Sequence, residues 1–593
     1  MKQLIKKRFL CTTLIFSLII SSVITGCSSG DKTTTDNISN ENTTKNISFD
    51  DYCQQLFVET ATSDALTLNY LISDINNFDI SDYPTVMLDF DSEDIALDKD
   101  KLSQIRQQLD IYDYNSLDKD QQITYDSLEY YLKSCQLSDG LELYMEPLGP
   151  TIGIQAELPI TLSEYTFYTS KDIERYLTAL PTIYDLFEEI MKFEEKKSQA
   201  GLFMSDDSVN NVLDQCNEFI SKKEDNYLIT SFNSKIDNYN GLTDEEKNSY
   251  KEKNKDIILN KIIPAYKLII DGLNELMTTG CNTGGLCNLP LGKQYYEYLV
   301  HSKVGTDESV SEITTNLENY ITSNMSAMYS ISSKDSDIYQ KAKDAKVDYN
   351  SPKEMLETLS TKILDDFPDV GNIEYELKDV DKSLEDYLSP AMYYKPPVDT
   401  SSCNSIYINN AKTKDSLNTF LTLAHEGFPG HMYEYNYIKS QKNYPLRQAL
   451  DITGVSEGWA KYAEYNAYRY CNLDENVADF LYANSKIALC VEARAEIGVN
   501  YEGWGKNEVY DYVSKYFKIN KDTADSIFQS AIETPANTLS YAYGEYIYST
   551  LEENARSLMG DKFVLKDFRT FLLDIGIAPF PVIKDRFKEY SQN

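Results

Sequence analysis

Apolar residues recur at intervals of three and four along most of the chain, and this periodicity constrains the fold more than any other feature. Leu102, Ile105 and Leu109 show the pattern in one segment, and comparable runs follow throughout the sequence. Such spacing places apolar side chains on one face of an α-helix. Strand-like alternation is scarce and is clearest at residues 374–377 and 405–409. The sequence therefore predicts a large, mostly helical body with a small β-sheet.

The N-terminal residues carry the pattern of a lipoprotein signal peptide. Basic residues at the start precede an apolar run over residues 9–24, which is too short for a comfortable membrane span. Residues 24–27 resemble the bacterial lipobox, which implies cleavage before Cys27 and attachment of lipid to its sulfur. An uncleaved anchor and an ordinary secretory signal are the alternatives. We expect an extracytoplasmic protein that acyl chains hold at the cell membrane.

The sequence divides into four segments, of which residues 1–26 are the signal peptide. Residues 27–46 are almost entirely polar and lack the apolar side chains that offset the entropy of ordering, so we expect a flexible tether. The helical pattern follows. We divide it into an N-terminal helical region, residues 47–280, and a C-terminal region, residues 281–593, and expect the two to form one integrated body.

The formal net charge of −38 restricts the partners of the chain. Binding to nucleic acid requires clusters of Lys and Arg that neutralise phosphates, so no nucleic acid partner is expected. The same charge favours solubility and opposes close adsorption to anionic lipid headgroups. Contact with the membrane is therefore expected through the N-terminal lipid.

Cysteine spacing leaves one pairing open. Cys281 and Cys287 flank a short loop that a local disulfide could close, and a pair of free thiols is an equal alternative. The chain lacks the paired Cys-x-x-Cys spacing of a structural zinc site.

The most specific chemical signal lies at residues 423–431. The chain has three histidines, and two of them, His425 and His431, fall in this stretch with Glu426 directly after the first. Two neutral imidazoles suit zinc, and an adjacent carboxylate suits a general base that acts on water. The alternative is a helix end with two surface histidines.

The spacing of these histidines requires an explanation. They are six residues apart, which on an ideal helix places them roughly 240° from one another and out of reach of a single ion. Gly427, Pro429 and Gly430 lie between them, and proline opposes helical geometry in the residue before it. We expect a local bulge of the helix that absorbs two residues and restores a shared face.

A third ligand is expected further along the chain. Glu457 and Glu464 are seven residues apart, so on a helix they share a face. Hydrolytic zinc sites usually keep three protein ligands and an open position for water. We favour Glu457 as the third ligand and Glu464 as the partner that orients an imidazole. A solvated helix face is the alternative.

Beyond the site, residues 389–397 are expected to be extended and to lead into the strand near residue 406. If that strand flanks the metal helix, its edge could pair with an extended peptide.

Two motifs resemble those of the domain of unknown function 885 family of bacterial zinc peptidases, in the zincin group. They are His-Glu-Gly-Phe-Pro-Gly-His at 425–431 and Glu-Gly-Trp-Ala-x-Tyr-Ala-Glu at 457–464. Leu289-Pro290-x-Gly292 and Ser389-Pro390-Ala391 look like further family motifs. The resemblance covers roughly residues 50–590. It implies a mostly helical, zincin-like body with a deep cleft and one zinc ion.

The resemblance also implies roles for individual residues. His425, His431 and Glu457 would be the metal ligands, Glu426 the catalytic base, and Tyr541 the hydroxyl that stabilises the oxyanion. Tyr543 and Tyr546 lie close to Tyr541 in sequence and compete for that last role.

Some positions depart from the family pattern. Arg569 stands where a histidine is usual, and residues 496–500 read Glu-Ile-Gly-Val-Asn where members often have Asp-x-Gly-x-His. These changes affect expected substrate contacts more than the proposed ligands, which are intact.

The resulting hypothesis is a zinc-dependent peptidase that hydrolyses oligopeptides at the cell surface. The main alternative is a catalytically inactive lipoprotein with a zincin fold that binds peptides or another ligand. Hydrolysis of a non-peptide amide, such as a cell-wall stem peptide linkage, is a third possibility.

Overall fold

The computed structural model describes residues 47–592, except residues 94, 95, 97, 350, 381, 383, 384, 386–388, 401–403, 442, 443 and 451. The expected signal peptide, the tether and Cys27 lie outside the described residues. Within the part of the chain that is described, no helix is both long and apolar enough to cross a membrane.

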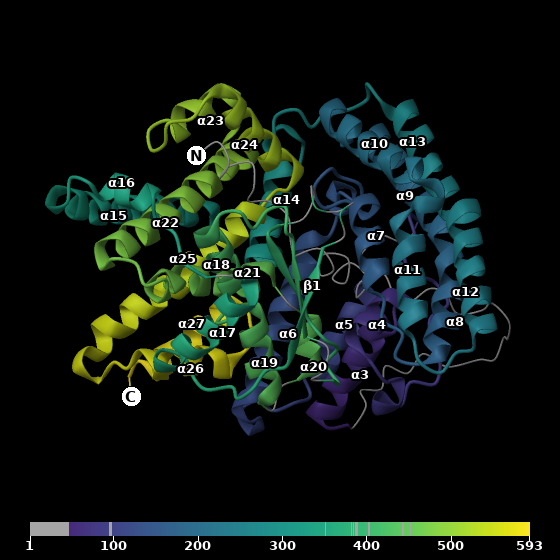
Figure 1. Cartoon of the computed structure of the whole chain (residues 1–593), viewed down its shortest axis with the longest axis horizontal. Coiled ribbons are helices and arrows are strands. Elements are labelled where there is room, and N and C mark those ends of the chain that lie inside the picture. Colours follow the sequence, from purple (N-terminus) through teal and green to yellow (C-terminus); the bar gives the residue numbers. More distant parts are fainter. Residues whose placement is uncertain are drawn as a thin grey trace.

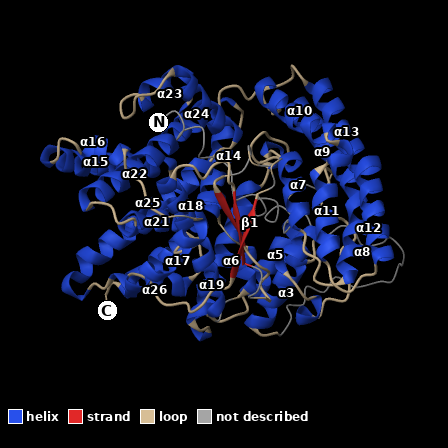
Figure 2. Cartoon of the chain, in the orientation of Figure 1, coloured by secondary structure: helices blue, strands red, loops and turns tan. Residues whose placement is uncertain are grey.

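Helices form most of the described chain, as the periodicity predicts (Figure 2). The first group comprises α3 (Phe49–Ala61), α4 (Ala65–Leu71), α5 (Lys99–Leu109), α6 (Lys119–Ser138), α7 (Ile154–Glu164), α8 (Ser170–Ala179), α9 (Ile183–Ala200), α10 (Asp206–Ser221), α11 (Tyr227–Asn238), α12 (Asp244–Ile257) and α13 (Ile263–Leu276). The second group comprises α14 (Gly292–Leu299), α15 (Val310–Lys334), α16 (Ile338–Lys343), α17 (Pro352–Lys362), α18 (Ser416–Glu426), α19 (His431–Ser440), α20 (Pro445–Ala449), α21 (Thr453–Asn466), α22 (Glu475–Ile497), α23 (Lys506–Val513), α24 (Lys521–Glu533), α25 (Asn537–Met559), α26 (Leu565–Ile575) and α27 (Phe580–Tyr590).

A small sheet accompanies the helices, as expected. Among the described residues it consists of β1 (Tyr375–Asp379), β2 (Ala391–Tyr394) and β3 (Asn404–Ile408), in the order β1-β3-β2. Strand β1 runs parallel to β3, and β2 runs antiparallel to it. The prediction that the strand near residue 406 offers a free edge is wrong, because β3 is central and pairs on both sides. The strand that packs against α18 is β2, in the segment that the sequence marks only as extended.

The apolar core follows the grouping of the helices. Side chains from α7 to α13 supply most of one cluster, and the helices from α14 to α27 with the sheet supply most of another. Figure 1 shows these groups on either side of β1. A further cluster joins α3, α4, α5 and α6 to Leu446 and Ala449 of α20. That cluster contains residues from both sides of residue 280. The expected boundary between the N-terminal and C-terminal regions at residue 280 stays a prediction.

Cys281 and Cys287 do not form the disulfide that was one of the two alternatives. Both are free thiols. The Cys281 thiol donates to the carbonyl oxygen of Gly201 at 2.7 Å, and the Cys287 thiol donates to that of Val499 at 3.3 Å.

Helices α21 and α25 touch backbone to backbone. A Cβ atom at Gly458 would lie 2.6 Å from the Cα and carbonyl carbon of Gly544. A Cβ atom at Gly544 would lie 2.0 Å from the carbonyl oxygen of Gly454. Neither glycine position has room for a side chain, so glycine sets the separation of the helices. Because Glu457 directly precedes Gly458, this contact also fixes the position of Glu457.

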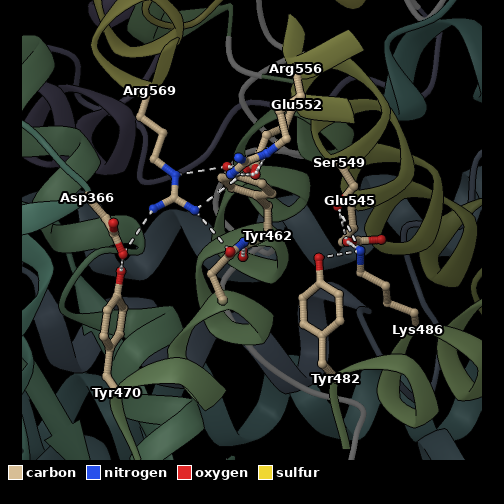
Figure 3. A network of polar contacts seen from close by, with 11 residues as sticks. Asp366, Tyr462, Tyr470, Tyr482, Lys486, Glu545, Ser549, Glu552, Arg556 and Arg569 are labelled. Carbon is tan, nitrogen blue, oxygen red and sulfur yellow. Dashed lines mark hydrogen bonds and ion pairs between the residues drawn. The ribbon is translucent and has the colours of Figure 1, made fainter. Parts of the chain in front are cut away.

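A buried polar network ties α21 to α25 and α26 (Figure 3). The Arg569 side chain is fully buried, and it donates from Nε to the Tyr462 hydroxyl and from Nη2 to Asn466 Oδ1, both at 2.9 Å. The Tyr462 hydroxyl donates to Glu552, whose Oε2 lies 3.6 Å from Arg569 Nη2. The guanidinium therefore has a counter-ion, which a buried charge requires.

Replacing Gly458 with alanine tests whether the contact between α21 and α25 supports the fold. The new methyl group would overlap the backbone of Gly544, and we expect the free energy of unfolding to fall by ~1–3 kcal/mol. The matched control is Gly272→Ala in α13, where the new atom meets only the flexible end of Met191. Helix propensity should make that variant neutral or more stable by up to ~1 kcal/mol. Urea unfolding measures both, and equal effects would contradict the proposed role of the contact.

Candidate metal centre

Helix α18 delivers His425 and Glu426 to the interior at its C-terminal end. The helix begins after Asp415, whose carboxylate accepts the N–H of Asn418 at 3.1 Å and so satisfies a free donor of the first turn. Phe420 and Ala424 on the same helix are buried. Burial of this face leaves the last residues of α18 enclosed, with His425 only 6% exposed and Glu426 only 3%.

The backbone between the two histidines interrupts the helix, because α18 ends at Glu426 and α19 begins at His431. The hydrogen bonds that cross the interruption join residues six apart: the Gly430 N–H donates to the carbonyl oxygen of Ala424 at 2.9 Å, and the Tyr433 N–H donates to that of Gly427 at 3.0 Å. An α-helix joins residues four apart, so two residues are absorbed here, as the sequence predicts. Pro429 lacks an N–H to continue a helix. A Cβ atom at Gly430 would lie 1.8 Å from the carbonyl oxygen of His425, so this close passage requires glycine.

The break brings the side chains of His425, His431 and Glu457 together. Glu457 Oε2 lies 3.2 Å from His425 Nε2 and 3.5 Å from His431 Nε2. The two imidazole rings are nearly perpendicular, with centroids 4.8 Å apart. One potential ligand atom from each residue lies within 4.8 Å of the others, so these three side chains could hold a metal ion.

Glu464 lies on the other side of the His425 ring. Its Oε2 is 3.2 Å from His425 Nδ1, the nitrogen that faces away from Glu457. Lys461 Nζ lies 2.5 Å from the same oxygen. A carboxylate at one ring nitrogen fixes the orientation of the imidazole and leaves the other nitrogen free to bind an ion. Lys461, which the sequence interpretation did not include, balances the charge of Glu464.

The buried charges of this cluster perturb one another. Burial alone would lower the pKa of His425, but the carboxylates of Glu457 and Glu464 more than offset it and raise that pKa to about 9. Burial would raise the pKa of Glu457, but the neighbouring His431 and His425 hold it well below its ordinary value. The arrangement therefore stabilises positive charge at the point where the three side chains meet.

Glu426 lies beside this point without belonging to the set of three. Its Oε1 is 3.9 Å from His425 Nε2, and its Oε2 accepts the backbone N–H of Tyr393 in β2 at 2.9 Å. Burial raises the pKa of Glu426, which suits a group that must take up a proton. Tyr393 was not predicted as a site residue, because its contribution is a backbone donor whose direction depends on strand pairing.

Trp459 contacts the segment between α18 and α19. Its indole Nε1 donates to the carbonyl oxygen of Pro429 at 3.1 Å, and the side chain is 1% exposed. The hydroxyl of Tyr433 donates to the carbonyl oxygen of Pro368 at 2.5 Å and anchors the start of α19. The sequence did not assign Trp459 a role at the site. The signal that could have identified it is its position two residues after the candidate ligand Glu457.

Tyr541 lies on the side of α25 that faces α21. Residues seven apart share a face of a helix, so Tyr541 lies on the face of Tyr548. The Tyr548 ring packs edge-on against Trp459 of α21, with centroids 5.8 Å apart. Tyr541 is half-buried. Its role at an oxyanion stays a prediction.

The two competing tyrosines turn toward α15 instead. The Tyr543 hydroxyl donates to Glu308 and accepts from Asn316 Nδ2 at 2.8 Å. Tyr546 stacks on Tyr543 and packs edge-on against Tyr320, with centroids 5.0 and 5.1 Å apart. These contacts occupy both rings away from α21, so Tyr541 is the better placed of the three.

The donor set fits a zinc ion. Two imidazole nitrogens and one carboxylate oxygen are ligands that hydrolytic zinc sites use. His431 Nε2 is buried and makes no hydrogen bond to any of the described residues. A buried polar atom without such a partner is costly, and coordination of an ion would satisfy it.

Comparisons with known structures agree with the fold. A candidate lipoprotein from Colwellia psychrerythraea is 16% identical, with a TM-score of 0.78 over 92% of this chain and 100% of that chain. A candidate lipoprotein of unknown function from Shewanella oneidensis is 13% identical, with a TM-score of 0.54 over 82% of this chain and 91% of that chain. Identities this low show similarity of fold alone. A candidate oligoendopeptidase F from Bacillus anthracis str. Ames is 10% identical, over 83% of this chain and 95% of that chain. Its TM-score of 0.32 is too low to show a shared fold.

Sequence comparison is more decisive about the family. No curated protein matches the chain. Residues 80–587, however, match a family described as bacterial protein of unknown function (DUF885), which spans most of the chain. The chain therefore belongs to the DUF885 family.

Proposed function

We propose that the protein is a zinc-dependent peptidase that hydrolyses oligopeptides. The observation that carries the proposal is the convergence of His425, His431 and Glu457, with the carboxylate of Glu426 beside them. Hydrolytic zinc sites combine these elements: three protein ligands, an open position and a nearby base. Zinc bound there would polarise a scissile carbonyl group and make water acidic enough to be deprotonated near neutral pH.

The residues of the chain would then move the protons. Glu426 takes a proton from the attacking water and gives it to the leaving amine. The Tyr393 N–H holds Glu426 Oε2, which leaves Oε1 on the side of His425 to receive the proton. The hydroxyl of Tyr541 donates to the oxyanion as the carbonyl carbon becomes tetrahedral. Glu464 keeps the His425 ring oriented throughout.

The alternative of an inactive scaffold was motivated by the six-residue spacing of the histidines. The backbone break between α18 and α19 accounts for that spacing, so the spacing no longer favours the alternative. A buried Glu426 at hydrogen-bonding distance from a fixed donor favours a catalytic base.

We also propose that the protein is lipid-anchored outside the cytoplasm through Cys27. The signal pattern at residues 1–27 supports this, and so do the two candidate lipoproteins that share the fold.

Metal analysis tests the three proposed ligands. We expect about one zinc per chain in the wild type, and loss of stoichiometric zinc in His431→Ala and Glu457→Gln, because each change removes one of three ligands. Glu464→Gln should bind zinc ~10–100-fold more weakly, because the imidazole loses its orienting partner. The control is His301→Gln, which alters the one histidine outside the site and should keep its zinc. Full zinc content in the ligand variants would exclude this site.

Hydrolysis of a mixed oligopeptide pool tests the base. Glu426→Gln keeps the size and one acceptor oxygen of the side chain but cannot take up the proton. We expect its kcat to fall by ~10²–10⁴-fold with unchanged zinc content. Stoichiometric zinc without cleavage of peptides by either protein would support the binding scaffold, and cell-wall stem peptides in the same assay test the amide alternative.

Cell fractionation tests the anchor. Cys27→Ser removes the sulfur that would carry the lipid, so we expect the protein to move from the membrane fraction to the soluble fraction. Cys281→Ser, which alters a half-buried free thiol in the body, should stay with the membrane. Membrane association of Cys27→Ser would point to an uncleaved anchor.

A further inference from the structure

A small cavity lies between α6, α20 and the start of α21. Its volume is about 40 Å³, and its walls include Tyr131 and Ser134 of α6, Arg447 of α20, and Ile452 just before α21. A cavity needs ~10–15 Å³ of such space to hold one water molecule, so this one has room for a larger guest. Among the described residues that line it, none is Asp or Glu. None belongs to the metal centre.

Arg447 is the unusual member of this lining. Its side chain is 2% exposed, and Nη1 donates to the carbonyl oxygen of Ile575 at 2.6 Å. Its Nε is buried without a hydrogen-bond partner among the described residues. No carboxylate of the described chain forms an ion pair with it, although a guanidinium offers five donors.

Such a charge requires compensation. Burial lowers the pKa of Arg447 to about 10, which leaves the guanidinium protonated at neutral pH. Removing a charged group from water costs several kcal/mol unless a counter-ion and hydrogen bonds replace the lost hydration. The charge of Asp120 favours the charged form of Arg447 but does not offset the effect of burial on its pKa. An anion in the cavity that Arg447 lines would supply this compensation.

Most of the other polar groups near the cavity already have hydrogen-bond partners, which limits the donors that could bind a guest. The Tyr130 hydroxyl donates to the carbonyl oxygen of His301 at 2.7 Å. Burial lowers the pKa of His301 to about 4, so its ring is neutral, and Asp307 at 3.2 Å favours a proton on Nε2. Nδ1 therefore accepts from the Ser134 hydroxyl at 2.7 Å. The Tyr131 hydroxyl, by contrast, is buried, and the Cys135 thiol beside it is only a weak acceptor.

We propose that this cavity binds a small monovalent anion, chloride or an anion of similar size, held by the Arg447 guanidinium and the Tyr131 hydroxyl. Both groups are donors, and both have unused hydrogen-bonding capacity toward the same space. Water can occupy donors, but it carries no charge to balance a guanidinium. The cavity volume of about 40 Å³ admits a halide or formate.

The anion would stabilise the entry to the metal-binding helix. Leu450 and Ile452 line the cavity, and Ile452 directly precedes α21, which carries Glu457. Pro579, on the loop before α27, closes another side. Neutralising Arg447 therefore favours the folded arrangement of α20, the start of α21 and this loop. This inference does not depend on the proposed peptidase activity.

Thermal unfolding at constant ionic strength, with chloride replacing gluconate, tests the proposal. Above the dissociation constant, the ratio of folded to unfolded wild-type protein should rise about ten-fold for each ten-fold rise in chloride, because the anion binds the folded state alone. Arg447→Gln should show no such rise. Tyr131→Phe removes one oxygen and should need about ten-fold more chloride for the same effect. Arg586→Gln, which alters an arginine already paired with Asp126 at 2.8 Å, should respond as the wild type does.

Bromide and formate in place of chloride identify the guest. Both should stabilise the wild type, and crystals soaked in bromide should show an anomalous peak between Arg447 and Tyr131. Stabilisation by formate but not by halides would assign the site to small carboxylates. Equal chloride responses in wild type, Arg447→Gln and Tyr131→Phe, or no response beyond that to gluconate, would overturn the proposal and leave the cavity to water.

Discussion

The candidate metal centre depends on one constraint: the chain must turn between His425 and His431 so that both imidazoles reach Glu457. A continuous helix points these side chains roughly 240° apart. The break at residues 427–430 removes that obstacle, and it persists because Gly430 has no side chain to strike the carbonyl of His425 and because Trp459 donates to Pro429. The same helix that supplies Glu457 therefore also holds the turn that supplies the histidines.

Helix α21 in turn is held from two sides. Gly458 lies against Gly544 of α25, so the helices are as close as their backbones allow. Tyr462 and Asn466, one and two turns later, accept from Arg569 of α26. A ligand on a rigid helix keeps its geometry better than one on a loop. The buried network thus helps to hold the helix that carries the carboxylate of Glu457.

The sequence predicts the helical body and the identity of the converging residues, because both follow from local patterns: periodicity for the helices, and residue type and spacing for the cluster. It does not predict the form of the turn. The spacing indicates that two residues are absorbed, but it does not predict that the helix is interrupted or that Trp459 donates to Pro429 from 30 residues away. Strand β2 was missed for the same reason. Its short run, Ala391–Tyr394, becomes a strand by pairing with β3, and only that pairing directs the Tyr393 N–H to Glu426.

Two buried arginines differ in how their charge is balanced, and this difference is visible only in the structure. Arg569 and Arg447 are both almost fully enclosed, and the sequence does not predict the burial of either. Arg569 lies within reach of Glu552, so its charge is balanced by the fold itself. Arg447 has one backbone acceptor and faces a cavity without acidic lining. Because both guanidinium groups remain charged at neutral pH, the cost of burial is similar for each. The fold meets that cost through Glu552 for Arg569, whereas for Arg447 the proposed anion would meet it.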